Sequence, residues 1–420
     1  MGKRSKKRRH DQKIKGMNII MERNFALIGM IIMMLSCGKE EPGSRRPTSD
    51  ENWRNPSFSI DSSANARKVC YMTGLDYPKD YDWRSDAQTG TVKCSLVVFA
   101  DGVPAMKVPV GLEHHVSPDP DMHRIIKGHL YTDFSTDEET IIKKDGRELF
   151  RYSGRERILG MAVREGKIYT LGRPREGSGF TYRENGMSLI HKESGRAFPR
   201  LQEEEDALSF AFCESIEYNG GYIDRYYQVV NGNISQVAVR EDILKVWDII
   251  RHEGEVCYVA ELTGVHAPVL IKGEKMKAMN ITSDMRLVSC KMVPAGKAVG
   301  IEAIFSRSGL SWSSGLWKDG EKQTTFANGL TISGLCTDGE SMCCILNQKG
   351  GSGGGIIFRC GEILDMPAGY TCMGSSPMAM VDGILTIGLT STREGNPIVW
   401  KDGRTQMVNI NGCICTLTVE

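Results

Sequence analysis

The chain has 420 residues, a length that ordinarily indicates two or three domains unless the sequence is built from repeats. Its 53 Lys and Arg residues nearly balance 52 Asp and Glu residues, so composition gives no electrostatic basis for nucleic-acid binding. A hydrophobic content of 40% excludes a wholly disordered chain, and 46 glycines indicate many tight turns.

The N-terminal segment 1–36 has the features of a leader. It holds nine Lys and Arg but only two Asp and Glu, and residues 25–35 form an apolar run of eleven residues. Such a run is too short to span a membrane, which takes about 20 residues, but it suits a signal peptide. The basic extension 1–16 is either part of the removed leader or lies upstream of a true start at Met17 or Met21.

The end of the apolar run reads Met34-Leu35-Ser36-Cys37, which resembles a bacterial lipobox, whose cysteine carries lipid. This resemblance implies that Cys37 is lipidated and begins the mature chain, so that the membrane is a partner through the lipid anchor.

The segment after the cysteine resembles a second sorting signal. Lys39, Glu40 and Glu41 resemble the lipoprotein export signal of Bacteroidota. That signal implies an outer-membrane lipoprotein that faces outside the cell. The following residues are polar and contain several prolines, so we expect 37–67 to be the lipidated cysteine and a flexible tether.

One hairpin pattern recurs through the rest of the chain, 68–420. An apolar strand, a two-residue turn that ends in glycine and a second strand repeat every 40 to 47 residues. Asp-Gly and Asn-Gly are the strongest hairpin signals because both turn residues need positive φ angles. The eight turn glycines are Gly102, Gly146, Gly186, Gly232, Gly273, Gly320, Gly361 and Gly403.

A second hairpin precedes each of the last seven turns, so each unit has four short strands, which we name A, B, C and D. Its turn glycines are Gly128, Gly166, Gly220, Gly254, Gly296, Gly339 and Gly383. Four strands in about 43 residues is typical of propeller blades. We therefore predict an all-β fold, a β-propeller of about eight four-stranded blades. Seven blades remain an alternative because the unit around 206–242 is degenerate.

The residues of strand C indicate that both faces of each sheet are covered. The position four residues before the turn glycine is apolar in seven units. These residues are Val98, Ile142, Tyr182, Val269, Leu316, Ile357 and Val399. The position three residues before it is apolar in six units, including Trp317 and Trp400. Apolar residues on both faces are expected when neighbouring blades pack against one another.

The first unit lacks strand A, and the chain ends in an alternating segment after Gly412. We expect this C-terminal segment to supply the inner strand of the N-terminal blade and to close the ring. Residues 68–420 loosely resemble propeller-bearing lipoproteins of Bacteroidota with YxxG and WK(D/N)G repeats, a likeness that implies no settled function.

Thirteen cysteines occur in the chain, and most lie in apolar strand-like runs. No pair has the spacing of a zinc site. Buried thiols in strands and one or more disulfides both remain open for an exported chain.

Candidate binding residues concentrate in the B–C loops, which share one face of the propeller with the D–A loops. Aromatic rings beside arginines suit stacking on sugars and binding of acidic groups. The candidates for ligand binding are Tyr77, Tyr81, Trp83, Arg84, Arg173, Arg307 and Trp312. Arg175, His266, Phe305 and Arg393 fall in the same loops. Ordinary local packing of these residues is the alternative interpretation.

Other chemistry has weaker support. His114, His115 and His123 are the densest cluster of metal-type ligands, but no helical pair or HExxH motif fixes their geometry, so we expect no metal site. The segment from Gly350 to Gly355 lacks the Lys and Ser or Thr of a phosphate loop, so no cofactor is expected.

Two function classes remain. The first is a surface binding or scaffold module for an extracellular glycan or a partner protein. The alternative is a glycan-processing hydrolase or lyase with its site at the mouth of the propeller channel. The lack of a recognisable catalytic motif favours the binding module, and a set of converging carboxylates would favour the enzyme.

Overall fold

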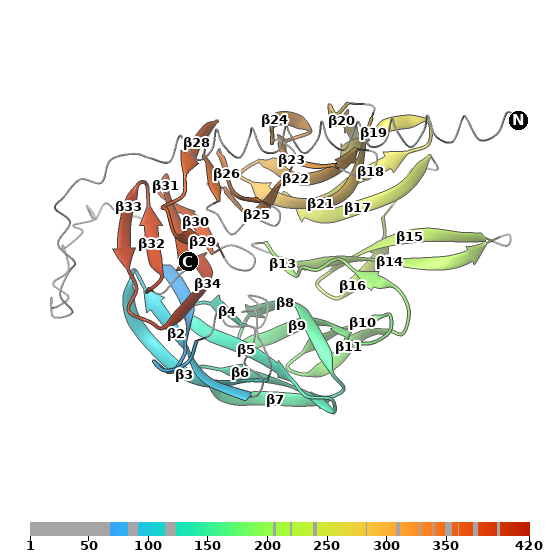
Figure 1. The fold of residues 1–420 in the computed structure, drawn as a ribbon. Coiled ribbons are helices and arrows are strands. Elements are labelled where there is room, and N and C mark those ends of the chain that lie inside the picture. The colour runs from blue at the N-terminus through green and yellow to red at the C-terminus, as the bar shows by residue number, and fades with distance from the viewer. Residues whose placement is uncertain are drawn as a thin grey trace, which may run out of the picture. The chain divides into compact units, whose positions relative to one another are not determined.

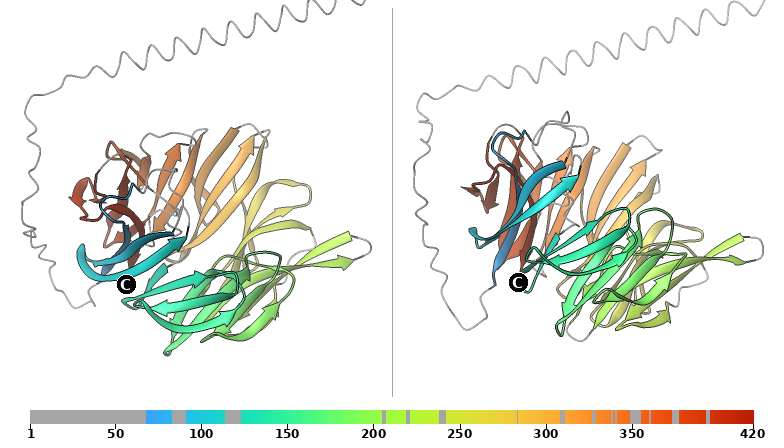
Figure 2. Two further views of the ribbon diagram at one scale, coloured as in Figure 1. Left: turned by 60° about the horizontal axis from the view of Figure 1, so that its bottom comes forward. Right: turned by 90° about the horizontal axis from the view of Figure 1, so that it is seen from below.

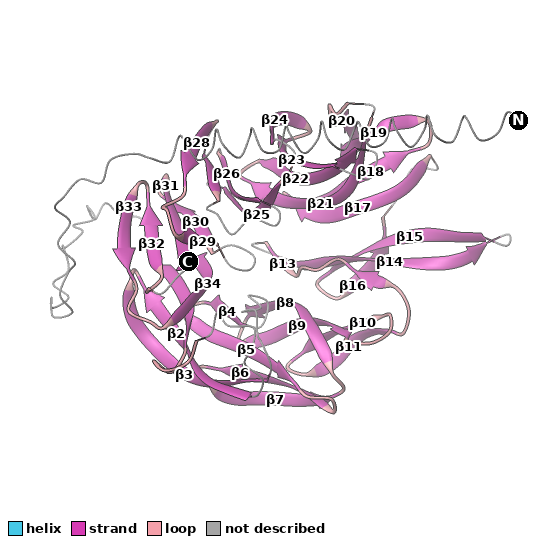
Figure 3. Cartoon of the chain, viewed as in Figure 1, coloured by secondary structure: helices cyan, strands magenta, loops and turns pink. Residues whose placement is uncertain are grey.

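The structure is a computed structural model that describes residues 68–82, 91–113, 123–204, 207–218, 221–237, 242–282, 284–307, 311–326, 329–337, 339, 341–348, 355–359, 361–372, 377–392 and 395–420. The described residues belong to one compact unit. The secondary structure in the described ranges is all strand and turn (Figure 3). No helix in these ranges has the length and apolar character needed to cross a membrane.

The strands form eight antiparallel sheets arranged in a ring, a β-propeller (Figures 1 and 2). In strand order A to D, blade 1 contains β34 (Gly412–Val419), β1 (Cys70–Asp76), β2 (Thr91–Ala100) and β3 (Val103–Glu113). Blade 2 contains β4 (His123–Ile126), β5 (His129–Ser135), β6 (Glu139–Lys144) and β7 (Arg147–Ser153). Blade 3 contains β8 (Glu156–Arg164), β9 (Lys167–Pro174), β10 (Phe180–Glu184) and β11 (Met187–Lys192).

Blade 4 begins with two short segments in place of one inner strand. It contains β12 (Arg196–Ala197), β13 (Gln202–Glu203), β14 (Leu208–Tyr218), β15 (Gly221–Val230) and β16 (Asn233–Gln236). Blade 5 contains β17 (Ile243–His252), β18 (Glu255–Leu262), β19 (Val265–Lys272) and β20 (Lys275–Ala278). Blade 6 contains β21 (Met285–Ala295), β22 (Ala298–Arg307), β23 (Ser311–Lys318) and β24 (Glu321–Phe326).

The last two blades complete the ring. Blade 7 contains β25 (Leu330–Thr337), β26 (Met342–Gln348), β27 (Ile356–Arg359) and β28 (Glu362–Asp365). Blade 8 contains β29 (Tyr370–Thr371), β30 (Met378–Val381), β31 (Ile384–Ser391), β32 (Ile398–Lys401) and β33 (Arg404–Met407). The prediction of a propeller with about eight blades is thus confirmed, and the seven-blade alternative is excluded.

The C-terminal strand closes the ring as expected. β34 pairs antiparallel with β1, from Cys70 opposite Val419 to Asp76 opposite Gly412. The side chain of Glu420 also accepts hydrogen bonds from the backbone N–H groups of Lys127 and Gly128, each at 2.6 Å, and so ties blade 1 to the first turn of blade 2.

The Asp-Gly and Asn-Gly turns have a second role besides reversing the chain. Both residues of each such turn have positive φ, for example 48° at Asp319 and 76° at Gly320. In six blades the Asp or Asn oxygen also accepts a hydrogen bond from the first backbone N–H groups of strand B. These pairs are Asp101 with Cys70, Asp145 with Leu130, Asn185 with Ile168, Asn231 with Leu208, Asp319 with Val299 and Asp402 with Leu385. The turn therefore joins three strands.

The core lies between the blades, which confirms that both sheet faces are covered. The seven apolar residues four positions before the turn glycine are at most 5% exposed. Trp317 is fully buried and Trp400 is 5% exposed. Most of the described cysteines are also buried in strands, and they form no disulfide with one another. This supports buried thiols over disulfides for the cysteines that the structure describes.

One part of the blade assignment from the sequence is wrong. Gly220 was expected in an A–B turn, but the strands on either side of it, β14 and β15, are the second and third strands of blade 4. The inner strand of this blade is the pair β12 and β13, whose connection to β14 contains no glycine.

Candidate functional site

The antiparallel order of strands divides the propeller into two faces. The A–B and C–D turns lie on one face, and the B–C and D–A connections lie on the other, which we call the B–C face. Not all B–C connections are long: β1 and β2 are separated by residues 77–90, whereas β5 and β6 are separated only by residues 136–138. The B–C loops, in which the candidate binding residues were predicted to concentrate, therefore differ greatly in length between blades.

The first B–C connection begins with two stacked tyrosines. The rings of Tyr77 and Tyr81 are 5.4 Å apart between centroids and inclined by 23°. Tyr77 is 7% exposed and packs in the core beside Cys94 and Cys413, and this burial raises the pKa of its hydroxyl. Tyr81 is half-buried, so it presents the more accessible ring of the pair. Trp83 and Arg84 lie outside the described residues.

The side chain of Asn411 holds this connection in place. Its Nδ2 donates to the backbone oxygen of Pro78 at 2.6 Å, and the backbone N–H of Tyr77 donates to the oxygen of Asn411 at 2.9 Å. Asn411 directly precedes the closing strand β34, so ring closure and the position of this part of the B–C face depend on the same residues.

Phe305 was expected on a loop, and the structure corrects this. It lies within β22, is 2% exposed and packs edge-to-face on Trp317 with a centroid distance of 5.3 Å. Ser306 and Arg307 continue the strand and pair with Trp312 and Ser311 of β23. The side chains of Arg307, Trp312 and His266 are not among the described ones, and Arg393 lies outside the described residues.

Of the three histidines predicted as weak metal ligands, only His123 is among the described residues. His123 begins β4, is 5% exposed, and its Nε2 lies 2.7 Å from the hydroxyl of Thr73 in β1. It therefore connects blades 1 and 2 in the interior. His114 and His115 lie outside the described residues, and within the described ranges no group of His, Cys, Asp and Glu is placed to hold a metal.

The structure does bring arginines together at the B–C end of blade 3. Arg173 stands directly opposite Arg157 in the pairing of β9 with β8, and the N–H of Arg175 donates to the oxygen of Arg155 at 3.1 Å. Arg157, Arg173 and Arg175 are exposed, and we call these three the arginine cluster. Like charges opposite each other on a sheet are unfavourable unless an anion offsets them.

The other side of β8 is held by a buried ion pair. Arg183 binds both carboxylate oxygens of Glu156, at 2.6 and 2.9 Å, and its guanidinium lies 3.9 Å from the ring of Tyr152. A Cβ at Gly172 would lie 2.2 Å from the Glu156 carboxylate, so any side chain here would displace that carboxylate from Arg183. Since side chains alternate along a strand, fixing Glu156 inward directs the neighbouring Arg157 outward.

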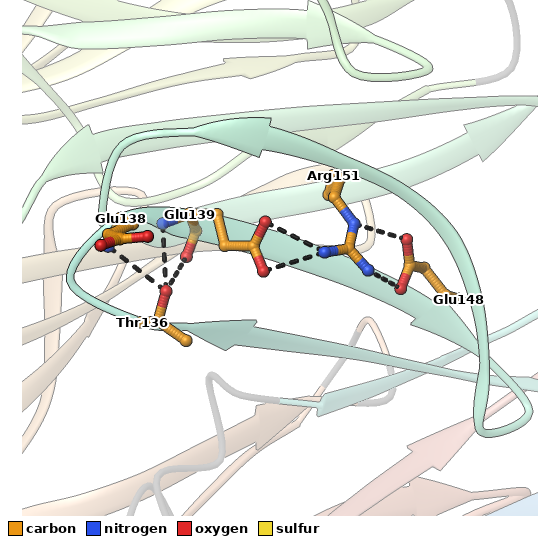
Figure 4. A network of polar contacts seen from close by, with 5 residues as sticks. All are labelled: Thr136, Glu138, Glu139, Glu148 and Arg151. Carbon is orange, nitrogen blue, oxygen red and sulfur yellow. Dashed lines mark hydrogen bonds and ion pairs between the residues drawn. The ribbon is translucent and has the colours of Figure 1, made fainter.

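Arg151 of blade 2 is neutralised, which distinguishes it from Arg173 and Arg175. Arg151 lies between Glu139 and Glu148 and donates to both carboxylates at distances from 2.6 to 3.1 Å (Figure 4). This hydrogen bonding lowers the pKa of Glu148. Arg173 and Arg175, in contrast, form no ion pair with any residue that the structure describes.

The sequence analysis did not include Arg157 among the candidate binding residues, although a sequence pattern could have indicated it. Arg155-Glu-Arg157 and Arg173-Pro-Arg175 stand at nearly equal distances from the Glu165-Gly166 turn. Two RxR segments placed symmetrically about a hairpin turn must meet across the strands, so pairing the segments would have added Arg157 to Arg173 and Arg175.

Comparison with known proteins gives likeness of fold alone. No protein-family model and no curated protein sequence matches the chain. Among solved structures it is similar to the β-propeller domain of the Trilobed protease from Pyrococcus furiosus, with 11% identity, 83% of this chain and 94% of that chain covered, and a TM-score of 0.40.

Two further similar structures are larger proteins. A prolyl endopeptidase has 9% identity over 79% of this chain, with a TM-score of 0.44, and an acylaminoacyl peptidase from Pyrococcus horikoshii has 10% identity over 78%, with a TM-score of 0.42. This chain covers 55% and 57% of those two proteins.

Proposed function

We propose that this protein is a lipid-anchored protein of the outer cell surface whose propeller binds an extracellular ligand through its B–C face. The binding role is supported chiefly by the arginine cluster, where Arg173 and Arg175 are exposed and form no ion pair with described residues. A glycan or a partner protein that carries acidic groups is the ligand class that fits. Arginine recognises carboxylates and phosphates in a planar, two-pronged geometry.

The rigid ring also suits a binding role. The Glu156–Arg183 ion pair and the closing strand hold the B–C end of blades 1 and 3 without help from a ligand. A site that is fixed before binding loses less conformational entropy when the ligand arrives. Tyr81 adds a half-buried ring on the same face, which can stack on a sugar.

The proposed location rests on Cys37 and on the Lys39-Glu40-Glu41 segment, both outside the described residues. Labelled palmitate should enter the wild type but not Cys37→Ala. Protease treatment of intact cells should cleave the propeller, and replacing Lys39, Glu40 and Glu41 by alanine should reduce cleavage. Equal labelling of wild type and Cys37→Ala would refute the anchor.

The binding role is tested by a glycan array and a pull-down of surface proteins. Arg173→Ala/Arg175→Ala should lose the acidic ligands that wild type binds, and Trp83→Ala/Trp312→Ala should lose ligands that depend on stacking. If both variants keep every ligand, the B–C face is not the binding face. Release of new reducing ends from a bound polysaccharide would make the protein a glycan-processing enzyme instead.

A further inference from the structure

Blade 4 breaks the repeat at one buried position. The residue four positions before the C–D turn glycine is apolar and buried in seven blades, and in blade 4 it is Gln228. Gln228 is 6% exposed, so it is buried to nearly the same degree as its seven counterparts. Polar residues at core positions of a repeat are expected mainly where function requires them.

The direction of Gln228 is fixed by its neighbours in the sheet. It stands opposite Ala211 in β14 and Ser235 in β16. Ala211 belongs to the core cluster that also contains Val246 and Tyr258 of blade 5. The side chain of Gln228 therefore faces blade 5, as the equivalent apolar residue of most blades faces the next blade.

At this point the two blades leave a groove of about 290 Å³. The residues that line it are Gln228, Ser235, Gln236, Val237, Glu255, Val256, Tyr258 and Gly273. Gln228, Ser235 and Gln236 come from β15 and β16, and Glu255, Val256 and Tyr258 come from β18; these strands are labelled in Figure 1. The groove lies toward the A–B and C–D turns, near Gly273, on the face opposite the arginine cluster.

The carboxamide of Gln228 forms no hydrogen bond with any described residue; the bond at this residue uses its backbone oxygen, which accepts from Ser235 at 3.5 Å. Its nitrogen and oxygen are not enclosed, because neither is among the described side-chain atoms that are buried without a partner, so the amide is open to solvent. An apolar residue here would fill the space as in the other blades. The groove therefore has a solvent-accessible donor and acceptor at a position where the other blades have a hydrophobic residue.

We propose that this groove is a second binding site, and that it takes one neutral sugar residue. Carboxamides both donate and accept, as sugar hydroxyls do, and a carboxylate accepts from two adjacent hydroxyls. Val237 and Val256 offer an apolar wall to the C–H face of the ring. Glu255 disfavours acidic sugars, and no Arg or Lys stands among the described lining residues. The volume is at the low end for ligand pockets, roughly 300–1,000 Å³, which favours a single ring.

The substitution Gln228→Val separates a binding role from a structural one because the two predict opposite results. Valine restores the residue type found at this position in the other blades, so the melting temperature should stay the same or rise. Binding of glucose, galactose or N-acetylglucosamine at millimolar concentration, measured by saturation-transfer NMR, should be found for wild type and weakened at least tenfold in Gln228→Val. Glu255→Gln should weaken it as well.

Gln323→Val is the matched control, because Gln323 is an exposed glutamine of β24 in blade 6 and lies far along the chain from the groove. It should leave both sugar binding and the melting temperature unchanged. The proposal is overturned if wild type binds none of the three sugars, if Gln228→Val binds as wild type does, or if Gln228→Val melts several degrees lower. Because Arg173 and Arg175 are untouched, loss of sugar binding here leaves the acidic ligands of the B–C face unaffected.

Discussion

Replacing Asp319 by alanine tests the link between the turns and the neighbouring strand. Asp319 Oδ1 accepts from the N–H of Val299 at 2.8 Å, and the N–H of Asp319 donates to the oxygen of Val299 at the same distance. Alanine removes the first bond and leaves the N–H of a fully buried residue without its acceptor. A hydrogen bond to a charged group contributes about 1.5–3 kcal/mol. Alanine at a φ of 48° costs about 1 kcal/mol more.

We therefore expect Asp319→Ala to lower the free energy of unfolding by about 2.5–4 kcal/mol, measured by urea denaturation with an unchanged m-value. Asp319→Asn keeps an acceptor and tolerates positive φ, so it should cost less than about 1 kcal/mol. Asp382→Ala is the control, since Asp382 also has a positive φ, 49°, and its side chain interacts, among the described residues, only with Lys68 in a 4.0 Å surface ion pair. The reasoning is wrong if Asp319→Ala destabilises no more than Asp382→Ala.

Three further predictions follow from the packing. Deleting residues 412–420 should abolish the cooperative thermal transition of the propeller, because β1 loses its inner partner; a melting temperature within a degree or two of wild type would refute closure. Trp317→Ala should cost about 3–5 kcal/mol in urea denaturation, and a near-neutral value would contradict its core position. Burial raises the pKa of Glu302, so its protonated form is favoured in the folded state and stability falls as pH rises through that pKa. Glu302→Gln should therefore stabilise more at pH 8 than at pH 4, and an equal effect at both would count against burial as the cause.

The repeat made most of the fold predictable. The Asp-Gly and Asn-Gly turns require positive φ at both residues, so they fix the hairpins and the strand register. The alternation around Trp317 and Trp400 then places both sheet faces in contact with neighbours. Blade 4 departed from the prediction because its inner strand is split into β12 and β13 and reaches β14 without a glycine turn. Composition alone carries no signal for such an interrupted strand.

The candidate site was harder to predict because exposure depends on where a strand ends. Phe305 was placed on a loop, yet β22 extends to Arg307 and keeps Ile301, Ala303 and Phe305 on one buried face. Tyr77 follows the end of β1 but turns inward, because Cys413 of the closing strand packs beside it. Both contacts join residues far apart in sequence, and only the arrangement of the blades brings them together.

The most direct test of the binding role is the affinity of the arginine cluster for an acidic polysaccharide. Heparin and polygalacturonate supply sulfate and carboxylate groups, and biolayer interferometry measures their binding at low and at physiological salt. Arg173→Ala/Arg175→Ala should weaken binding about tenfold or more, since two ionic contacts together reach about 1.4 kcal/mol, and the loss should shrink at higher salt. Arg147→Ala/Arg404→Ala removes the same charge from exposed sites beside C–D turns and should keep wild-type affinity. Equal affinities for the two double variants would show that binding follows net charge, and the B–C face would lose its assigned role.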